Sequence, residues 1–105
     1  EVWYGAHSDD AAGSAYPDCT PEFYIAMNKA IFHGTGHKVS LLAPLLNLNK
    51  AQVVAAGLKI NAPYELTRSC YEGHEFACGK CATCIDRLNA FGQNLVDDPI
   101  QYEEA

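Results

Sequence analysis

Four of the five cysteines in this chain follow the pattern C-x7-C-x2-C-x2-C, formed by Cys70, Cys78, Cys81 and Cys84. A two-residue spacer lets a tight turn aim two sulfurs at one point, about 2.3 Å from a tetrahedral zinc ion. Gly79 lies inside the first such spacer, where a positive φ costs glycine little. Cys84 is expected in the first turn of a helix, whose positive end favours a thiolate. The pattern therefore predicts a closed four-Cys structural zinc site with no open position for catalysis.

Three other arrangements of the cysteines stay open. His74 could replace one thiol in a Cys3His site. Two disulfides and one free thiol would also use all five cysteines, although an odd number fits a closed disulfide set poorly. An iron–sulfur cluster is the third, but its usual spacings differ. Because no secretory signal precedes the cysteines, we expect a reducing, cytoplasmic compartment, where clustered thiols hold metals more often than they form bridges.

Length and charge limit the classes of function. The 105 residues amount to one small domain with a marginal core, which a metal or a partner could support. Seven basic residues against 13 acidic ones give a net charge of −6, which argues against binding to a nucleic-acid backbone or an anionic membrane. The chain does not begin with Met, and its first residues lack the basic start of a signal peptide. We therefore expect a fragment or an excised domain.

The order of apolar segments predicts the second half of an open α/β sheet. A short buried strand is expected over 2–7, which is rich in β-branched and aromatic residues. A second strand is expected over 39–43, which is apolar nearly throughout, as in a parallel sheet covered on both faces. Residues 8–17 and the Cys-rich 70–80 are expected to be loops. Since two strands make no viable sheet, the remaining strands should come from missing sequence or another chain.

Helices are expected between these segments. One begins after a Thr20 cap and stops at Gly34-Thr35-Gly36, and a second runs from an Asn49 cap to a stop at Gly57. A short turn covers 61–66 and a last helix covers 81–95, broken by Asp97-Asp98-Pro99 and followed by an acidic tail. The residues expected on the inner faces of the second and last helices are Val53, Val54 and Ala56, then Ile85, Leu88, Ala90, Phe91 and Leu95.

The loop before the first helix carries a second set of candidates. Tyr16-Pro17-Asp18-Cys19 is expected at the carboxyl end of the first strand, where open α/β sheets bind ligands. Asp18 could hold an amine, an amidine or a metal, and Cys19 is not needed for the zinc. Both could instead only shape the entry to the helix.

Four weaker candidates complete the set. His7 ends a strand and could touch a ligand or be a satisfied core histidine. Arg68 and Arg87 flank the Cys loop, and either could bind a phosphate or carboxylate or form an ordinary salt bridge. Asp9-Asp10 is expected to be a solvated turn, and two further histidines are expected on the surface, His33 and His37.

Several motifs occur together along nearly the whole chain. The first group is Tyr4-Gly5-Ala6-His7, Asp9-Asp10 and Tyr16-Pro17-Asp18-Cys19. The middle group is Ala43-Pro44-Leu45, Gly57-Leu58 and Pro63-Tyr64-Glu65-Leu66-Thr67. The most specific group is Ser69-Cys70-Tyr71-Glu72-Gly73 with the three later cysteines, then Arg87 and Asp98-Pro99. In this combination the chain resembles the 7-cyano-7-deazaguanine synthase family; similar ATP pyrophosphatase-type enzymes lack the Cys pattern.

The resemblance implies a fold of the adenine nucleotide α-hydrolase-like (PP-loop ATP pyrophosphatase) class, an α/β parallel sheet. Residues 1–66 would be the second half of its Rossmann-like domain, and 67–105 a helical zinc-binding C-terminal region. It also implies a zinc-containing ligase of queuosine biosynthesis, commonly a homodimer. With ATP and Mg²⁺, such an enzyme converts 7-carboxy-7-deazaguanine and ammonia to the nitrile preQ0. The carboxylate is adenylated, ammonia gives an amide, and a second activation dehydrates the amide.

By position, the family's zinc ligands correspond to the four clustered cysteines, and Asp18 and Cys19 to its substrate-side loop; no catalytic residue is assigned. Many relatives carry Arg where this chain has Thr20. The family's phosphate-binding Ser-Gly-Gly-x-Asp-Ser loop is absent from these residues, so the chain is expected to be an inactive C-terminal fragment of the ligase. The alternative is a stand-alone zinc-binding module that binds another protein through its open sheet edge.

Overall fold

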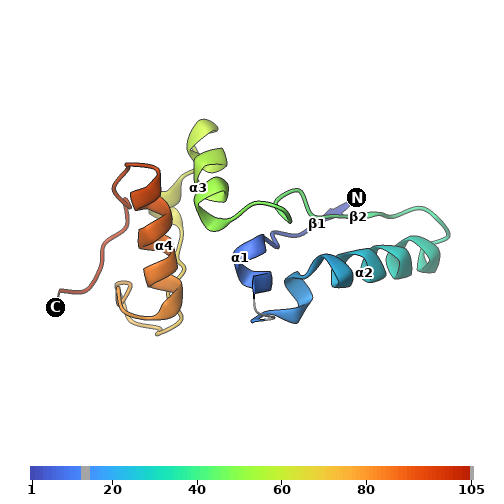
Figure 1. Ribbon diagram of the computed structural model, residues 1–105, viewed down its shortest axis with the longest axis horizontal. Coiled ribbons are helices and arrows are strands. Elements are labelled where there is room, and N and C mark those ends of the chain that lie inside the picture. Colours follow the sequence, from blue (N-terminus) through green and yellow to red (C-terminus); the bar gives the residue numbers. More distant parts are fainter. Residues whose placement is uncertain (13–14, 105) are drawn as a thin grey trace. The chain divides into compact units, whose positions relative to one another are not determined.

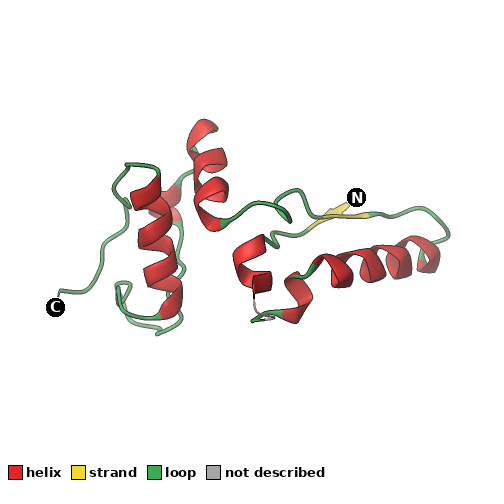
Figure 2. Cartoon of the chain, viewed as in Figure 1, coloured by secondary structure: helices red, strands yellow, loops and turns green. Residues whose placement is uncertain are grey.

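The computed structural model describes residues 1–12 and 15–104. It divides into two compact units, Glu1–Asn49 and Lys50–Ala105. Both are built mainly from helices, and the strands that the structure describes lie in the first unit (Figures 1 and 2). The expected α/β class is thus confirmed as a mixed fold with a small parallel sheet. The domain boundary expected after residue 66 concerns a longer protein and stays a prediction.

No helix within residues 1–12 and 15–104 is both long and apolar enough to span a bilayer.

The sheet consists of two short parallel strands. β1 (Val2–Trp3) pairs with β2 (Leu41–Leu42), with Val2 opposite Leu41 and Trp3 opposite Leu42. Both strands are shorter than predicted, because the chain leaves the ladder after Tyr4 N donates to Leu42 O at 3.0 Å. Leu41 is buried, but Val2 and Trp3 are 50% and 63% exposed. The expected burial of the first strand is therefore wrong, since a sheet of two strands leaves its faces and edges uncovered.

The predicted loop over 8–17 is wrong in part, because it contains helix α1 (Ser8–Ala11). Asp9 and Asp10 lie in its first turn, where the positive helix end favours acidic side chains. Both Ser8 N and Ser8 Oγ donate to Leu48 O, at 2.8 and 2.9 Å, and hold the start of this helix. Gly13 and Ser14, also placed in that loop, lie outside the described residues. A 3₁₀ turn, η2 (Pro17–Cys19), follows.

Helix α2 (Pro21–Gly34) begins and ends where the sequence predicts. Thr20 Oγ1 accepts from Phe23 N at 3.2 Å, and the hydroxyl of Thr35 donates to Ile31 O at 2.8 Å. Asn28 Oδ1 accepts from Leu41 N at 2.8 Å, which fastens α2 alongside β2 (Figure 1). No residue of α2 is fully buried: Phe23, Ile31 and Phe32 are half-buried, and Ile25 and Met27 are exposed.

The second unit packs α3 (Lys50–Lys59) against α4 (Ala82–Gln93), with the 3₁₀ turn η3 (Tyr64–Leu66) beside them (Figure 1). Val54, Ala90 and Phe91 form its buried centre. The Tyr64 ring meets Phe91 edge-on with 5.2 Å between ring centroids. This packing fixes α4, which contains Cys84 and is directly preceded by Cys81, against α3 and η3.

Gly57 does not stop α3, which continues to Lys59. The hydroxyl of Tyr64 occupies the space that a Cβ at Gly57 would need, and it donates to Val54 O at 3.2 Å. The glycine therefore permits close approach of η3 and does not end the helix. Ala56, which was expected on the inner face, is exposed.

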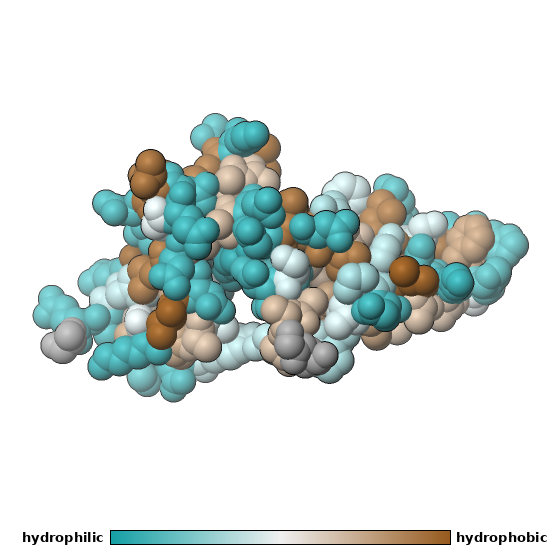
Figure 3. Space-filling model, viewed as in Figure 1, coloured by the Kyte–Doolittle hydropathy of each residue, from teal (hydrophilic) through white to brown (hydrophobic). Residues whose placement is uncertain are grey.

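Helix α4 ends at Gln93, four residues before the predicted Asp97 breaker, and Leu95 follows with a φ of 58°. Ala90 and Phe91 are buried as expected. Three residues that were assigned to its apolar face are exposed: Ile85, Leu88 and Leu95. Apolar side chains on the molecular surface are visible as brown areas in Figure 3. No other described element of this chain packs over Ile85, Leu88 and Leu95 closely enough to bury them.

The last residues are not the free acidic tail that the sequence predicts. Tyr102 forms a parallel bridge with Ala77, and Glu103 N donates to Ala77 O at 2.8 Å. Ile100 and Tyr102 pack against the buried cluster that contains three of the cysteines. The C-terminal segment thus braces the Cys-rich loop. Ala105 lies outside the described residues.

Candidate metal centre

Three segments of the second unit bring the four cysteines together. Cys70 lies in the extended chain after η3, and Cys78 lies in the loop that Ala77 and Tyr102 brace. Cys81 is the residue before α4, and Cys84 lies in the first turn of that helix, as predicted. Cys70, Cys78 and Cys84 are buried, and Cys81 is half-buried. The site is therefore enclosed by protein on most sides.

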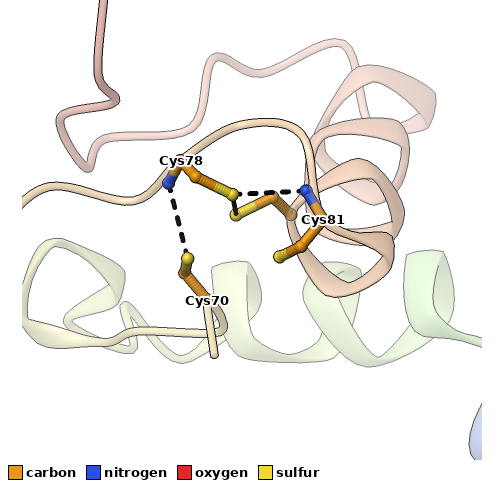
Figure 4. Close-up of side chains that lie close together, drawn as sticks. Cys70, Cys78 and Cys81 are labelled. Atoms are coloured by element: carbon orange, nitrogen blue, oxygen red, sulfur yellow. Dashed lines mark hydrogen bonds between the residues drawn. The ribbon is translucent and has the colours of Figure 1, made fainter. Parts of the chain in front are cut away.

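The four sulfur atoms all lie within 4.8 Å of one another. Cys78 Sγ and Cys84 Sγ are 3.9 Å apart, close to the separation of about 3.8 Å between two sulfurs of a tetrahedron with metal–sulfur bonds of about 2.3 Å. Figure 4 shows Cys70, Cys78 and Cys81 around this common centre. All five cysteines of the chain are free thiols. The geometry fits a four-coordinate, thiolate-preferring metal such as zinc.

Backbone amides point at the sulfurs. Cys78 Sγ accepts from Cys81 N at 3.2 Å, and Cys70 Sγ accepts from Cys78 N at 3.4 Å (Figure 4). Cys78 Sγ also accepts from Lys80 N at 3.3 Å, and Cys70 Sγ from Glu72 N at 3.4 Å. Gly79 has the predicted positive φ, 72°, which turns the loop so that these amides face inward. Such donors favour the thiolate form that a metal binds.

The surroundings act differently on individual sulfurs. The Cys78 and Glu72 amides lower the pKa of Cys70. The hydrogen bond with Thr83, whose Oγ1 is 3.1 Å from the sulfur, lowers the pKa of Cys81 to about 6. Burial raises the pKa of Cys84 to about 12. At neutral pH Cys84 thus becomes a thiolate only beside a cation, which is the charge that a divalent metal would supply.

His74 lies outside this cluster. Its exposed ring pairs through Nδ1 with Glu103. The structure therefore assembles the four-Cys set and not the Cys3His alternative.

An ion pair whose acidic partner was not identified from the sequence lies beside the metal centre. Arg87 is buried and donates from Nε and Nη2 to both carboxylate oxygens of Asp98, at 2.7 and 3.1 Å. Its Nη2 also donates to Tyr64 O at 3.2 Å, and the hydroxyl of Tyr102 donates to Asp98. Of the two roles open to Arg87, the structure shows the salt bridge. Arg68 remains exposed and donates to Cys70 O at 3.2 Å.

Comparison with known proteins gives this geometry its context. The family profile described as "Queuosine biosynthesis protein QueC" matches residues 1–95. The chain belongs to the QueC family. Three curated relatives, each named 7-cyano-7-deazaguanine synthase, come from Marinobacter nauticus, Aliarcobacter butzleri and Caldicellulosiruptor saccharolyticus. They are 44%, 47% and 45% identical over 97%, 98% and 98% of this chain.

In each of these three QueC relatives, the matched region is 45% of the relative's own length. The chain thus spans about half the length of the curated relatives it matches. The expected family membership is confirmed, and the motifs that indicated it lie within the matched residues.

The second candidate site of this QueC-family chain lies in the first unit. Asp18 is exposed and Cys19 half-buried, both in η2. Burial, followed by the charges of Asp10 and Asp18, raises the pKa of Cys19, so it remains a thiol at neutral pH. His7 is buried, and its Nε2 lies 3.1 Å from Asp10 Oδ2. The turn expected for Asp9-Asp10 is wrong, because both residues lie in α1, but the Asp10 side chain stays 40% exposed beside His7.

The sequence contained signals for the contacts of Asp98 and Tyr102, but these residues were given other roles. Asp98 was interpreted only as a helix breaker, although an acidic side chain eleven residues after Arg87 was available to pair with it. Tyr102, the one aromatic residue in the predicted tail, indicated that the tail packs against the protein.

Proposed function

We propose that this chain is the C-terminal part of a 7-cyano-7-deazaguanine synthase and that its four clustered cysteines hold a structural zinc ion. The observation that carries the proposal is the convergence of four sulfurs in a chain that matches the QueC family over residues 1–95. The relatives bearing that enzyme name match nearly the whole chain. The PP-loop fold, the homodimer and a cytoplasmic location belong to the same proposal.

The zinc would be structural because the four sulfurs form a complete tetrahedral set. Cys70, Cys78, Cys81 and Cys84 would hold it. When bound, it would supply positive charge that stabilises the thiolates and a crosslink between the chain after η3, the Cys loop and the start of α4. The chain's own contribution is the ring of inward-pointing amides and the brace formed by Ile100 and Tyr102.

For the longer enzyme, we propose the ligation of 7-carboxy-7-deazaguanine with ammonia to the nitrile, driven by ATP with Mg²⁺. Asp18 and Cys19 would lie on the substrate side, where the exposed Asp18 carboxylate can accept hydrogen bonds from an amine or amidine edge. Residues 1–105 lack the Ser-Gly-Gly-x-Asp-Ser phosphate loop, so nucleotide binding would depend on the remainder of the enzyme.

The test is ATP consumption by a full-length protein that carries this chain. We expect pyrophosphate release only when both ATP and the deazapurine acid are present, with nitrile as the final product once ammonia is added. ATP hydrolysis that ignores the acid would contradict the proposal. Calorimetry of the 105-residue chain with ATP and Mg²⁺ should show no tight binding, and micromolar affinity would mean that the nucleotide site lies within these residues.

A zinc-binding protein-interaction module is the second candidate, favoured by the exposed Trp3 on β1 and Ile25 on α2. Apolar side chains beside an open strand edge are suited to pairing with another chain. The full-length protein separates the two functions, because an interaction module would consume no ATP with the deazapurine acid.

A further inference from the structure

His7 is a buried histidine in which one ring nitrogen contacts a carboxylate and the other has no hydrogen-bond partner. The residue is 8% exposed, and its Nε2 lies 3.1 Å from Asp10 Oδ2. Among the described residues, Nδ1 is buried without a hydrogen-bond partner. Buried polar atoms normally find partners, so an orphaned one in a folded chain calls for a ligand or another role.

The contact with Asp10 fixes the tautomer of the ring. An ionised carboxylate only accepts hydrogen bonds, so Nε2 of a neutral His7 carries the proton and donates it to Asp10. Nδ1 then presents a bare lone pair. A histidine whose donor nitrogen is held by a carboxylate and whose other nitrogen is unprotonated is arranged as a proton acceptor, because the carboxylate also stabilises the imidazolium that forms.

Helix α1, which carries Asp10, lies next to η2, which carries the candidate residues Asp18 and Cys19. Asp10 O accepts from Tyr16 N, the residue directly before η2, at 3.0 Å. Tyr4 Oη is the second buried polar atom without a partner in the described chain, and burial, then the charges of Cys19 and Asp18, raises the pKa of Tyr4. Tyr4 and His7 follow β1, at the strand end where open α/β sheets bind ligands.

We propose that Nδ1 of His7 accepts the proton released when ammonia attacks the activated carboxyl group, and that Asp10 is the residue that positions it. This inference rests on the proposed ligase function. In that step the ammonia lone pair forms the new C–N bond. The bond from the acyl carbon to the adenylate oxygen breaks, and its electron pair leaves with AMP. One N–H proton passes to Nδ1, leaving the amide and a His7 imidazolium paired with Asp10.

The first experiment measures the tautomer in the 105-residue chain. Long-range ¹H–¹⁵N correlation spectra at neutral pH should show His7 with a protonated Nε2 and a bare Nδ1. Asp10→Asn should relax this to a tautomer mixture, whereas Glu22→Gln, which removes an exposed carboxylate on α2, should not. A proton on Nδ1, or on both nitrogens, near neutral pH would overturn the proposal.

The second experiment separates the two chemical steps in the full-length protein. His7→Asn keeps an acceptor oxygen close to the Nδ1 position but cannot take up a proton. It should retain acid-dependent exchange of pyrophosphate into ATP, yet lose about 100-fold or more in amide formation. His33→Asn changes an exposed histidine and should leave both rates unchanged.

The outcomes of these experiments separate a failure of the proposed His7 role from a failure of the proposed ligase function. Wild-type rates of amide formation in His7→Asn would overturn the acceptor role while leaving the ligase function intact. Equal losses in both steps would show that His7 is structural, which also overturns it. An unmodified full-length protein without acid-dependent pyrophosphate exchange would instead overturn the ligase function, and the proposed proton transfer with it.

Discussion

Both carboxylate oxygens of Asp98 accept hydrogen bonds from the guanidinium of Arg87, and the two side chains are only 2% and 4% exposed. Arg87 also reaches Tyr64 O and lies 3.4 Å from Ser69 Oγ, next to Cys70. One buried ion pair thus joins η3, the chain before the first cysteine, α4 and the C-terminal segment. The pair is connected to the metal centre through Ser69, which precedes Cys70, and through Tyr102, which packs against the cysteine cluster.

Asp98→Ala should destabilise the chain by about 3–5 kcal/mol, because it leaves a buried guanidinium without its counter-charge. The matched control is Asp97→Ala, which removes an exposed carboxylate one residue earlier and should change stability by less than about 0.5 kcal/mol. Denaturant unfolding of the zinc-loaded proteins measures both. Equal, small effects would show that the pair contributes little.

The same pair predicts a pH dependence. Burial alone would raise the pKa of the Asp98 carboxyl, but the donors from Arg87 and Tyr102 hold it below its ordinary value. The pKa of Asp98 is thus lower in the folded chain than in the unfolded chain, where it is about 3.9. The pair therefore stabilises the fold fully above that unfolded-state pKa, and this stabilisation is lost as the pH falls through the pKa of the folded state. The stability difference between the unmodified chain and Asp98→Asn should therefore shrink from neutral pH toward about pH 3. A difference that stays constant would contradict the assignment. The comparison is restricted to the pH range in which both proteins hold their metal, because metal loss would itself disorder α4.

Two glycine-to-alanine substitutions in helices should change the free energy of unfolding in opposite directions. Gly57→Ala places a methyl group where the Tyr64 hydroxyl lies, and Tyr64 is held by Phe91 and Val54. It should destabilise the chain by about 1–3 kcal/mol despite the better helix propensity of alanine. Gly92→Ala in α4 meets no atom within 4 Å and should stabilise by up to about 1 kcal/mol. Thermal unfolding of both variants checks this, and a stabilised Gly57→Ala would show that Tyr64 moves freely.

The 105-residue chain should self-associate at micromolar concentration, most simply as a two-fold dimer. Val2 and Trp3 on β1, and Ile25 on α2, are exposed apolar residues of a unit with an open strand edge. The net charge of −6 opposes association, but salt screens it over about 8 Å under physiological conditions. Sedimentation should show a larger species that Trp3→Glu weakens. A monomer without dye-accessible apolar surface would contradict the prediction.

Local chemistry made several elements predictable from sequence. The Thr20 cap, Pro21 and the Gly34-Thr35-Gly36 stop act within a few residues of one another, so α2 was placed correctly. The Cys spacing likewise constrains a short loop, and the four sulfurs meet as predicted. Features that depend on distant partners were missed. Gly57 is explained only by Tyr64, and Asp98 only by Arg87.

The burial of apolar segments could not be predicted because it depends on what covers them. Trp3 and Ile85 have the spacing of buried residues yet are exposed in this chain. In the first unit, the pairing of His7 with Asp10 required α1, a short helix hidden within a run of turn-forming residues. The His7–Asp10 pair was therefore not predicted, and a ligand role for Asp18 and Cys19 stays a prediction.

The most direct test of the account is the zinc content of the purified 105-residue chain. Elemental analysis should give one zinc per chain. Cys81→Ser should lose the metal and most of the ordered structure around α4, since structural zinc contributes on the order of 10 kcal/mol in small sites. Cys19→Ser, which changes the cysteine outside the cluster, should retain the full zinc content. A metal-free chain that still unfolds cooperatively, or a Cys81→Ser variant as stable as the original, would contradict the structural zinc centre.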